Sequence, residues 1–153
     1  MKVSDLIFED SIFFLEVKNK DELFEKIAEI ISDKNREIES KENLLSLMKA
    51  REKQGNTFAR KEVAIPHVKC KFLKNFKIYL FIIKNGIEYK EDEEKVKIVF
   101  MIIGPDKNYN IHLLLLSRIA RLIKETSVIK EILNKQDSGI IHSIISENER
   151  KII

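Results

Sequence analysis

The chain has 153 residues, of which 35% are charged and 44% hydrophobic, and its formal net charge is +3. This composition is typical of a folded globular protein that is long enough to bury a substantial core. The charge is mild, and basic and acidic residues alternate along the sequence, so nucleic-acid binding is not expected. A single cysteine, Cys70, excludes an internal disulfide and agrees with a reducing cytoplasm.

No apolar run approaches the roughly 20 residues that a membrane-spanning helix needs, and the first residues do not resemble a secretory signal. The sequence shows no low-complexity stretch and no internal repeat. We therefore predict a single domain over residues 1–153, located in the cytoplasm and without direct insertion into a membrane.

The first third of the chain predicts a strand and then two helices. Ser11–Val17 is rich in the aromatic and β-branched residues that favour strands. Asn19 followed by Glu22 resembles a capping box, which predicts the start of a helix there. Ser40 is placed to cap a second helix, and Gly55 is placed to end it.

Two long apolar segments, Phe76–Ile83 and Lys95–Ile103, are the strongest predicted strands. Nearly continuous apolar runs indicate burial on both faces, so helices are expected on both sides of the sheet. The eleven residues between these segments are too few for a helical crossover, which predicts antiparallel neighbours. Helices then follow at about 111–125, 128–135 and 139–149. The predicted fold is α/β, a mixed sheet flanked on both faces by helices.

The run Val63–His67 places an imidazole directly after a short apolar strand and a proline. Pro66 cannot donate a ladder hydrogen bond, so it belongs at the end or the edge of a strand. It also pushes Ile65 toward extended geometry. We therefore expect the strand to stop at His67 and to present this side chain at the rim of the sheet.

His112 is expected in the first turn of the helix that begins near residue 111. Asn108 or Asn110 would cap this helix, and His112 shares a face with Leu115 and Ile119, so it should point toward the body of the protein. The positive end of the helix dipole favours a neutral imidazole there. Unpaired backbone amides at the same end can bind a phosphate-like anion.

Four short segments in this order resemble a known family. Arg51-Glu52, Gly55–Thr57, Ala64–His67 and His112-Leu113 are similar to the corresponding segments of enzyme IIA of the bacterial sugar phosphotransferase system. The resemblance is to the fructose/mannitol type, including its nitrogen-regulatory branch, and it covers nearly the whole chain.

The resemblance implies that His67 carries a phosphoryl group, which it receives from the phosphocarrier protein HPr or its nitrogen-branch homologue. The group would pass to enzyme IIB or act as a signal to a regulated protein. By the same resemblance, His112 orients or hydrogen-bonds the phosphoryl group and Arg51 binds its equatorial oxygens. Thr57 and Asn56 would add further donors. Such a site requires no cofactor and no metal.

The chain departs from the family pattern at two places. Phe58–Glu62 stands where family members usually have a glycine-rich turn, and Val68 follows the histidine where a small residue is common. Less glycine means less backbone freedom, and Val68 adds bulk near the site. The alternative hypothesis is therefore a regulatory or binding module on the same fold that no longer transfers phosphate.

Two further residues invite a chemical interpretation. Cys70 lies three residues after His67, but three histidines and one cysteine do not provide the spaced ligand set of a zinc site. His142 lies among isoleucines in the last predicted helix and matches nothing in the family pattern. We interpret Cys70 and His142 as structural.

Overall fold

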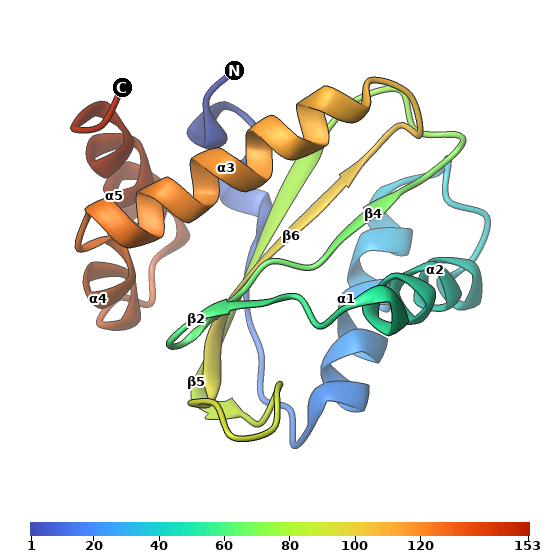
Figure 1. Ribbon diagram of the computed structural model, residues 1–153, viewed down its shortest axis with the longest axis horizontal. Helices are drawn as coiled ribbons and strands as arrows, with labels where there is room; N and C mark the ends of the chain where they lie inside the picture. The colour runs from blue at the N-terminus through green and yellow to red at the C-terminus, as the bar shows by residue number, and fades with distance from the viewer.

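One mixed sheet of six strands organises the computed structural model, which describes every residue from Met1 to Ile153 (Figure 1). The strand order is β1-β5-β6-β3-β2, and β4 pairs with β6 alone. The two long central strands are antiparallel, whereas β1 pairs with β5, and β3 and β4 pair with β6, in parallel. The strands are β1 (Ile12–Phe14), β2 (Phe58–Arg60), β3 (Val63–Ala64), β4 (His67–Lys69), β5 (Lys77–Ile87) and β6 (Val96–Gly104).

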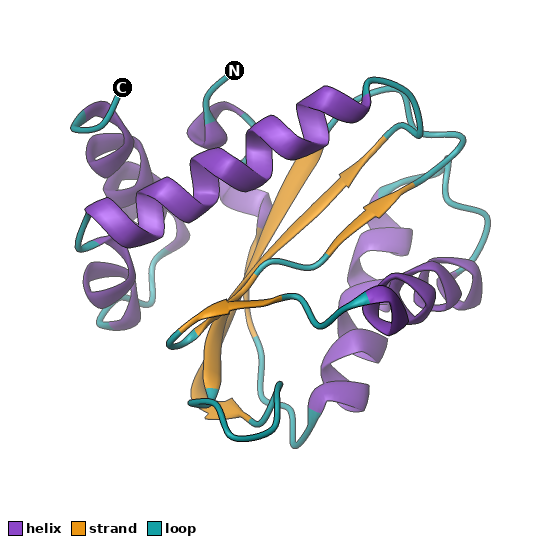
Figure 2. Ribbon diagram, viewed as in Figure 1, coloured by secondary structure: helices purple, strands orange, loops and turns teal.

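Helices cover both faces of this sheet (Figure 2). The first two pack on one face and the last three on the other, which confirms the predicted α/β class. None of them is long and apolar enough to cross a membrane. The helices are α1 (Lys20–Lys34), α2 (Lys41–Gln54), α3 (Tyr109–Glu125), α4 (Val128–Leu133) and α5 (Ser138–Arg150), preceded by the 3₁₀ turns η1 (Val3–Asp5) and η2 (Glu9–Ser11).

The central strands send alternate side chains into two separate cores. On β5, Ile78 and Leu80 join the core beneath α3, α4 and α5, whereas Tyr79 and Phe81 join the core beneath α1 and α2. This is the period of two that a strand imposes on its side chains. Because both faces are covered, both sets are apolar, which explains the continuous hydrophobic runs in the sequence.

The predicted helix starts are confirmed by their caps. The side chain of Asn19 accepts a hydrogen bond from the backbone N–H of Glu22, and Ser40 accepts one from Asn43. The first strand is shorter than predicted, because residues 9–11 form the η2 turn and the chain leaves the sheet soon after Phe14. It must do so to cross from the edge of the sheet to the start of α1.

The prediction that the strand stops at His67 is wrong. Residues 58–64 form a tight β2–β3 hairpin, which turns at Lys61 with a left-handed φ of 44°. Pro66 interrupts the strand, but its carbonyl accepts a hydrogen bond from the N–H of Ile102, so the ladder with β6 continues. His67 therefore opens a second short strand, β4, in register with Ile102.

Glu149 on α5 fastens the beginning of the chain. Its carboxylate accepts hydrogen bonds from the backbone N–H of Val3 at 2.6 Å, the backbone N–H of Ser4 at 3.0 Å and the hydroxyl of Ser4 at 2.7 Å. Only 2% of Glu149 is exposed. This contact connects the two termini, which lie close together in Figure 1.

We predict that Glu149→Ala lowers the free energy of unfolding by about 3 kcal/mol, because it leaves buried donors without partners. Urea denaturation followed by circular dichroism measures the change. Glu147→Ala, at an exposed position on the same helix, is the control and should have little effect. Equal stabilities for the two variants would contradict a fastening role for Glu149.

Candidate functional site

The register of β4 turns the His67 side chain toward α3. His67 lies opposite Ile102, whose side chain belongs to the core beneath α3, and Val68 lies opposite Ile103, which belongs to the core beneath α1 and α2. Because side chains alternate along a strand, His67 and Val68 point to opposite faces. β4 has no second strand partner, so groups from α2 can reach His67 around its open edge.

Two hydrogen bonds fix the tautomer of His67. Its Nδ1 lies 3.2 Å from the carbonyl oxygen of Ile65, and its Nε2 lies 3.1 Å from Nε of Arg51. A carbonyl oxygen only accepts and a guanidinium only donates. Nδ1 must therefore carry the proton, which leaves Nε2 with a lone pair. The nucleophilic atom of this side chain is Nε2.

The surroundings of His67 lower the pKa of its imidazole below the ordinary value of 6.5. Burial is the largest cause, and electrostatic interactions with Arg51, His112 and Lys69 add to it. The hydrogen bond to the Ile65 carbonyl acts in the opposite direction. The net effect keeps the ring neutral at neutral pH, and only the neutral ring can act as a nucleophile.

Arg51 is held between the end of α2 and His67. While its Nε donates to the imidazole, its Nη1 donates to the carbonyl oxygen of Gly55 at 2.8 Å. Its second terminal nitrogen, Nη2, makes no such bond within the chain. The guanidinium is thus positioned by two contacts and keeps a donor group for another acceptor.

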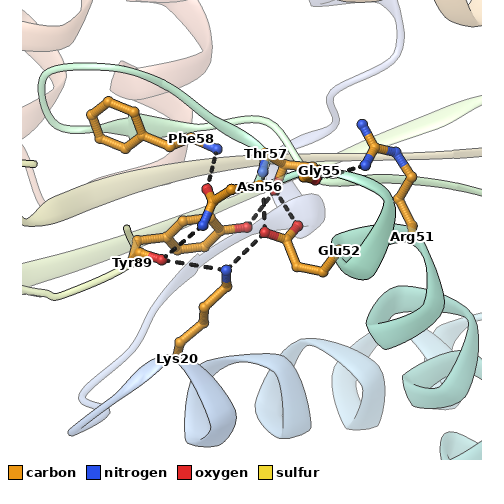
Figure 3. Close-up of polar contacts among 8 residues, drawn as sticks. All are labelled: Lys20, Arg51, Glu52, Gly55, Asn56, Thr57, Phe58 and Tyr89. Atoms are coloured by element: carbon orange, nitrogen blue, oxygen red, sulfur yellow. Dashed lines mark hydrogen bonds and ion pairs between the residues drawn. The ribbon is translucent and has the colours of Figure 1, made fainter. Parts of the chain in front are cut away.

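A partly buried polar network around Glu52 holds the loop that follows α2 (Figure 3). Glu52 pairs with Lys20 at 2.7 Å and accepts from both the backbone N–H and the hydroxyl of Thr57. The hydroxyls of Thr57 and Tyr89 lie 2.6 Å apart. Since Thr57 donates its only proton to Glu52, Tyr89 must donate to Thr57. Burial, and next to it the charge of Glu52, raise the pKa of Tyr89, so its hydroxyl stays protonated.

The same network involves two residues that were expected to bind the phosphoryl group. The hydroxyl proton of Thr57 belongs to Glu52, and the residue is 7% exposed. Asn56 donates to the carbonyl oxygen of Tyr89 at 3.1 Å and accepts from the backbone N–H of Phe58 at 2.8 Å. In this structure both side chains therefore hold the loop, although the exposed amide of Asn56 keeps a second N–H that bonds to no group of the chain.

His112 is buried, with 2% exposure, in the first turn of α3 and points into the protein. Its Nε2 lies 3.0 Å from the carbonyl oxygen of Pro105, and its ring packs edge-on against Phe76 at 4.7 Å between centroids. Its Nδ1 is buried without a hydrogen-bond partner. Gly104 makes this packing possible, because a Cβ there would lie 2.3 Å from the Phe76 ring.

The predicted side-chain cap of α3 is not formed. Asn108 does occupy the cap position, but it adopts a left-handed conformation with φ of 58° and its side chain makes no capping bond. Asn110 lies inside the helix. The backbone N–H groups of this first turn are therefore not satisfied by an asparagine side chain, contrary to the usual pattern.

Arg51, His67 and His112 line one open depression of about 570 Å³ between α2, β4 and α3. Its rim carries three exposed apolar side chains, Leu47, Tyr109 and Leu113. On β4, Lys69 points to the same face as His67 and places its ammonium 3.8 Å from the centre of the Tyr109 ring. Residues from distant parts of the sequence thus form one accessible site with a nucleophilic nitrogen and several cationic donors.

Comparison with known protein families identifies the family to which this chain belongs. Residues 5–148 match the family described as "Phosphoenolpyruvate-dependent sugar phosphotransferase system, EIIA 2", and the chain belongs to this family. Members of this family are components of a phosphotransferase system. The resemblance in the sequence is therefore confirmed at the level of the family.

Curated relatives come from both branches of the family. The chain is 28% identical to a nitrogen regulatory protein of Bradyrhizobium diazoefficiens, covering 95% of each chain. It is 26% identical to the fructose-specific EIIABC component of Bacillus subtilis, covering 98% of this chain and 24% of that protein. The chain thus spans about a quarter of the fructose-specific relative and nearly all of the regulatory one.

Solved structures share the fold. The nitrogen regulatory protein IIA-Ntr of Neisseria meningitidis superposes with a TM-score of 0.85 at 21% identity, covering 94% of this chain and 98% of that one. The mannitol enzyme IIA of Escherichia coli, solved in complex with phosphorylated enzyme IIB, superposes with a TM-score of 0.74 at 16% identity. That match covers 90% of this chain and 95% of the other.

We predict that the pKa of the His67 imidazole lies below 6.5. Two-dimensional NMR of its ring nitrogens, recorded over a pH series, measures this pKa. Arg51→Ala removes one positive neighbour, so the pKa should rise but stay below 6.5, because burial remains. Arg36→Ala, at an exposed position, should leave it unchanged. A lowered pKa also means that the unfolded chain binds this proton more readily, so acidification through 6.5 destabilises the fold. A wild-type midpoint at or above 6.5 would contradict the assigned environment.

Proposed function

We propose that this protein is a phosphohistidine carrier in which Nε2 of His67 accepts a phosphoryl group. The donor would be HPr or its nitrogen-branch homologue, and the group would pass to enzyme IIB or serve as a regulatory signal. The observation that supports this most directly is the tautomer of His67, with its proton held on Nδ1 by the Ile65 carbonyl. This leaves the Nε2 lone pair at a site open to a partner protein.

In the transfer step, Nε2 attacks phosphorus as the bond between phosphorus and the donor's histidine nitrogen breaks. The leaving nitrogen keeps the electron pair of that bond, and the Nδ1 proton of His67 stays in place. Positive charge develops on the His67 ring and is stabilised by the hydrogen bond from Nδ1 to Ile65. No metal is required for this balance, because the transition state is loose and depends on positioning.

Arg51 would shift from the nitrogen to the phosphoryl oxygens during this step. Its Nε–H occupies the Nε2 lone pair in the resting site, so that bond must break when phosphorus approaches. The guanidinium is already adjacent, and its donors can then bind equatorial oxygens. The resting contact thus positions the donor at the atom where the new bond forms.

His112 would stabilise the phosphoryl group through Nδ1, its unpartnered ring nitrogen. Since Nε2 faces a carbonyl oxygen, it already carries a proton. Nδ1 can donate to a phosphoryl oxygen only if the ring takes up a second proton.

The departures from the family pattern do not obstruct this site. Val68 is among the residues that line the His67 depression, but it is only 5% exposed and its side chain packs in the core beneath α1 and α2, on the face opposite His67. No residue of Phe58–Glu62 lines the His67 depression. The structure therefore offers no specific support for a non-transferring binding module, which remains the competing outcome of the experiment below.

We expect phosphorylated HPr, or its nitrogen-branch homologue, to add one phosphoryl group to this protein, detected by intact mass under mildly alkaline conditions. His67→Ala should abolish the label, whereas His142→Ala should keep it, because His142 lies on α5 and bonds to the Ser4 carbonyl. Absence of label with either carrier would favour the binding module. Incubation of the labelled protein with enzyme IIB then distinguishes transport from regulation.

His112→Gln should slow phosphorylation by about 100-fold, the usual cost of losing one donor to a developing oxyanion. Glutamine can still donate to the Pro105 carbonyl, so the free energy of unfolding should fall by only about 1 kcal/mol. Rapid-quench measurement gives the rate, and urea denaturation gives the stability. His142→Gln is the matched control. If rate and stability fell together, His112 would be a purely structural residue.

A further inference from the structure

A second depression, of about 780 Å³, lies between the β2–β3 hairpin and α4, and we call it the basic cleft. It contains the C-terminal end of α3, whereas the His67 depression contains the N-terminal end. From His112 to Lys124 the helix extends about 18 Å, and Figure 1 shows it running from the side of β4 to α4. The two depressions share no residue.

The basic cleft brings together positively charged residues that are far apart in the sequence. One acidic side chain, Glu62, lines it, and Lys97 neutralises this group in an ion pair of 3.1 Å. The local excess of positive charge exceeds the net charge of +3 of the whole chain. The basic lining residues are Arg60, Lys61, Lys84, Lys97, Lys124 and Lys130.

Other polar groups in the cleft do not compensate this charge. The hydroxyl of Thr126 donates to the Leu122 carbonyl, and the hydroxyl of Ser127 donates to Glu131. Apart from Lys97, none of the basic lining residues forms an ion pair within the chain. Like charges gathered in a concave surface repel one another, so an anion that neutralised them would stabilise the cleft.

The hairpin that forms one wall is the segment that departs from the family pattern. Arg60, Lys61 and Glu62 stand where a glycine-rich turn is usual, and Lys61 takes the left-handed conformation of the turn. The departure thus contributes two of the cations and one side of the cleft. This gives the altered turn a chemical consequence away from His67.

We propose that the basic cleft binds a small organic molecule that carries a chain of two or more phosphates, such as a nucleoside triphosphate. Its volume lies in the range of small-molecule sites. The cations suit successive phosphates, and the partly exposed apolar side chains of Ile123, Ile129 and Leu133 suit a ring attached to them. The size of the cleft favours such a small ligand over a nucleic acid, which follows a more extended basic surface.

The test is an NMR titration of the ¹⁵N-labelled full chain with ATP, inorganic triphosphate and a single-stranded oligonucleotide. We expect saturable binding of one ATP, with shifts confined to the β2–β3 hairpin, the parts of β5 and β6 around Lys84 and Lys97, the end of α3 and α4. Because the apolar lining contributes, ATP should bind about fivefold more tightly than inorganic triphosphate. The binding is independent of His67 and should persist in His67→Ala.

A pair of charge-matched variants makes the result specific. Lys124→Gln/Lys130→Gln removes two cations of the cleft and should weaken ATP binding about tenfold. Lys26→Gln/Lys49→Gln removes the same charge from exposed positions on α1 and α2, and it should leave the affinity nearly unchanged. All four positions are exposed, so both variants should fold.

Four outcomes would overturn the proposal. Absence of saturable ATP binding would leave the cleft without this ligand. Equal weakening in both variants would indicate diffuse charge attraction. Equal affinity for ATP and inorganic triphosphate would exclude a role for the apolar lining. Tighter binding of the oligonucleotide, with the same loss in the Lys124→Gln/Lys130→Gln variant, would assign the cleft to nucleic acid.

Discussion

The ladder between β6 and the two short strands on either side of Pro66 determines the site. Proline removes one backbone donor and breaks the strand, yet its carbonyl still accepts from Ile102, so the chain resumes pairing at His67 in a defined register. The break leaves the Ile65 carbonyl facing the imidazole, where it fixes the proton on Nδ1. A single strand interruption therefore sets both the face to which His67 points and the atom that carries its lone pair.

Groups from both faces of the sheet meet at this interruption because β4 has one strand partner only. α3 places His112 on the face that His67 points to, and α2 brings Arg51 from the opposite face around the open edge of β4. Contacts outside the site also hold the two side chains, His112 and Arg51, in position. Phe76 supports His112 from the core, and the Glu52 network holds the loop whose Gly55 carbonyl binds Arg51. A partly buried network with this many hydrogen bonds restrains the loop, which suits a site that depends on positioning.

The sequence was most informative where local chemistry decides the structure. Asn19 and Ser40 predicted helix starts because their caps involve neighbouring residues, and the apolar runs predicted the central strands because period and burial are readable along the chain. The resumption of the strand after Pro66 was missed, since it depends on pairing with Ile102, far away in sequence. Lys20 and Tyr89 were missed for the same reason: nothing near either residue indicates that it will meet Glu52. Thr57 was expected to offer a free hydroxyl because its partners, Glu52 and Tyr89, are brought to it only by the tertiary structure.

The two departures from the family pattern both place their side chains away from the His67 imidazole. Val68 lines the depression beside the nucleophile, but the alternation of the strand directs its side chain into the opposite core and away from the imidazole. The charged hairpin adds cations, but it lies at the other end of α3, where Lys124 and Lys130 from other segments join it. Alternating charges in the sequence gave no indication of this cluster, because proximity in space here comes from the hairpin, the sheet and two helices together. The central strands that orient His67 thus also support the basic cleft, where the sequence of this chain departs from the family pattern.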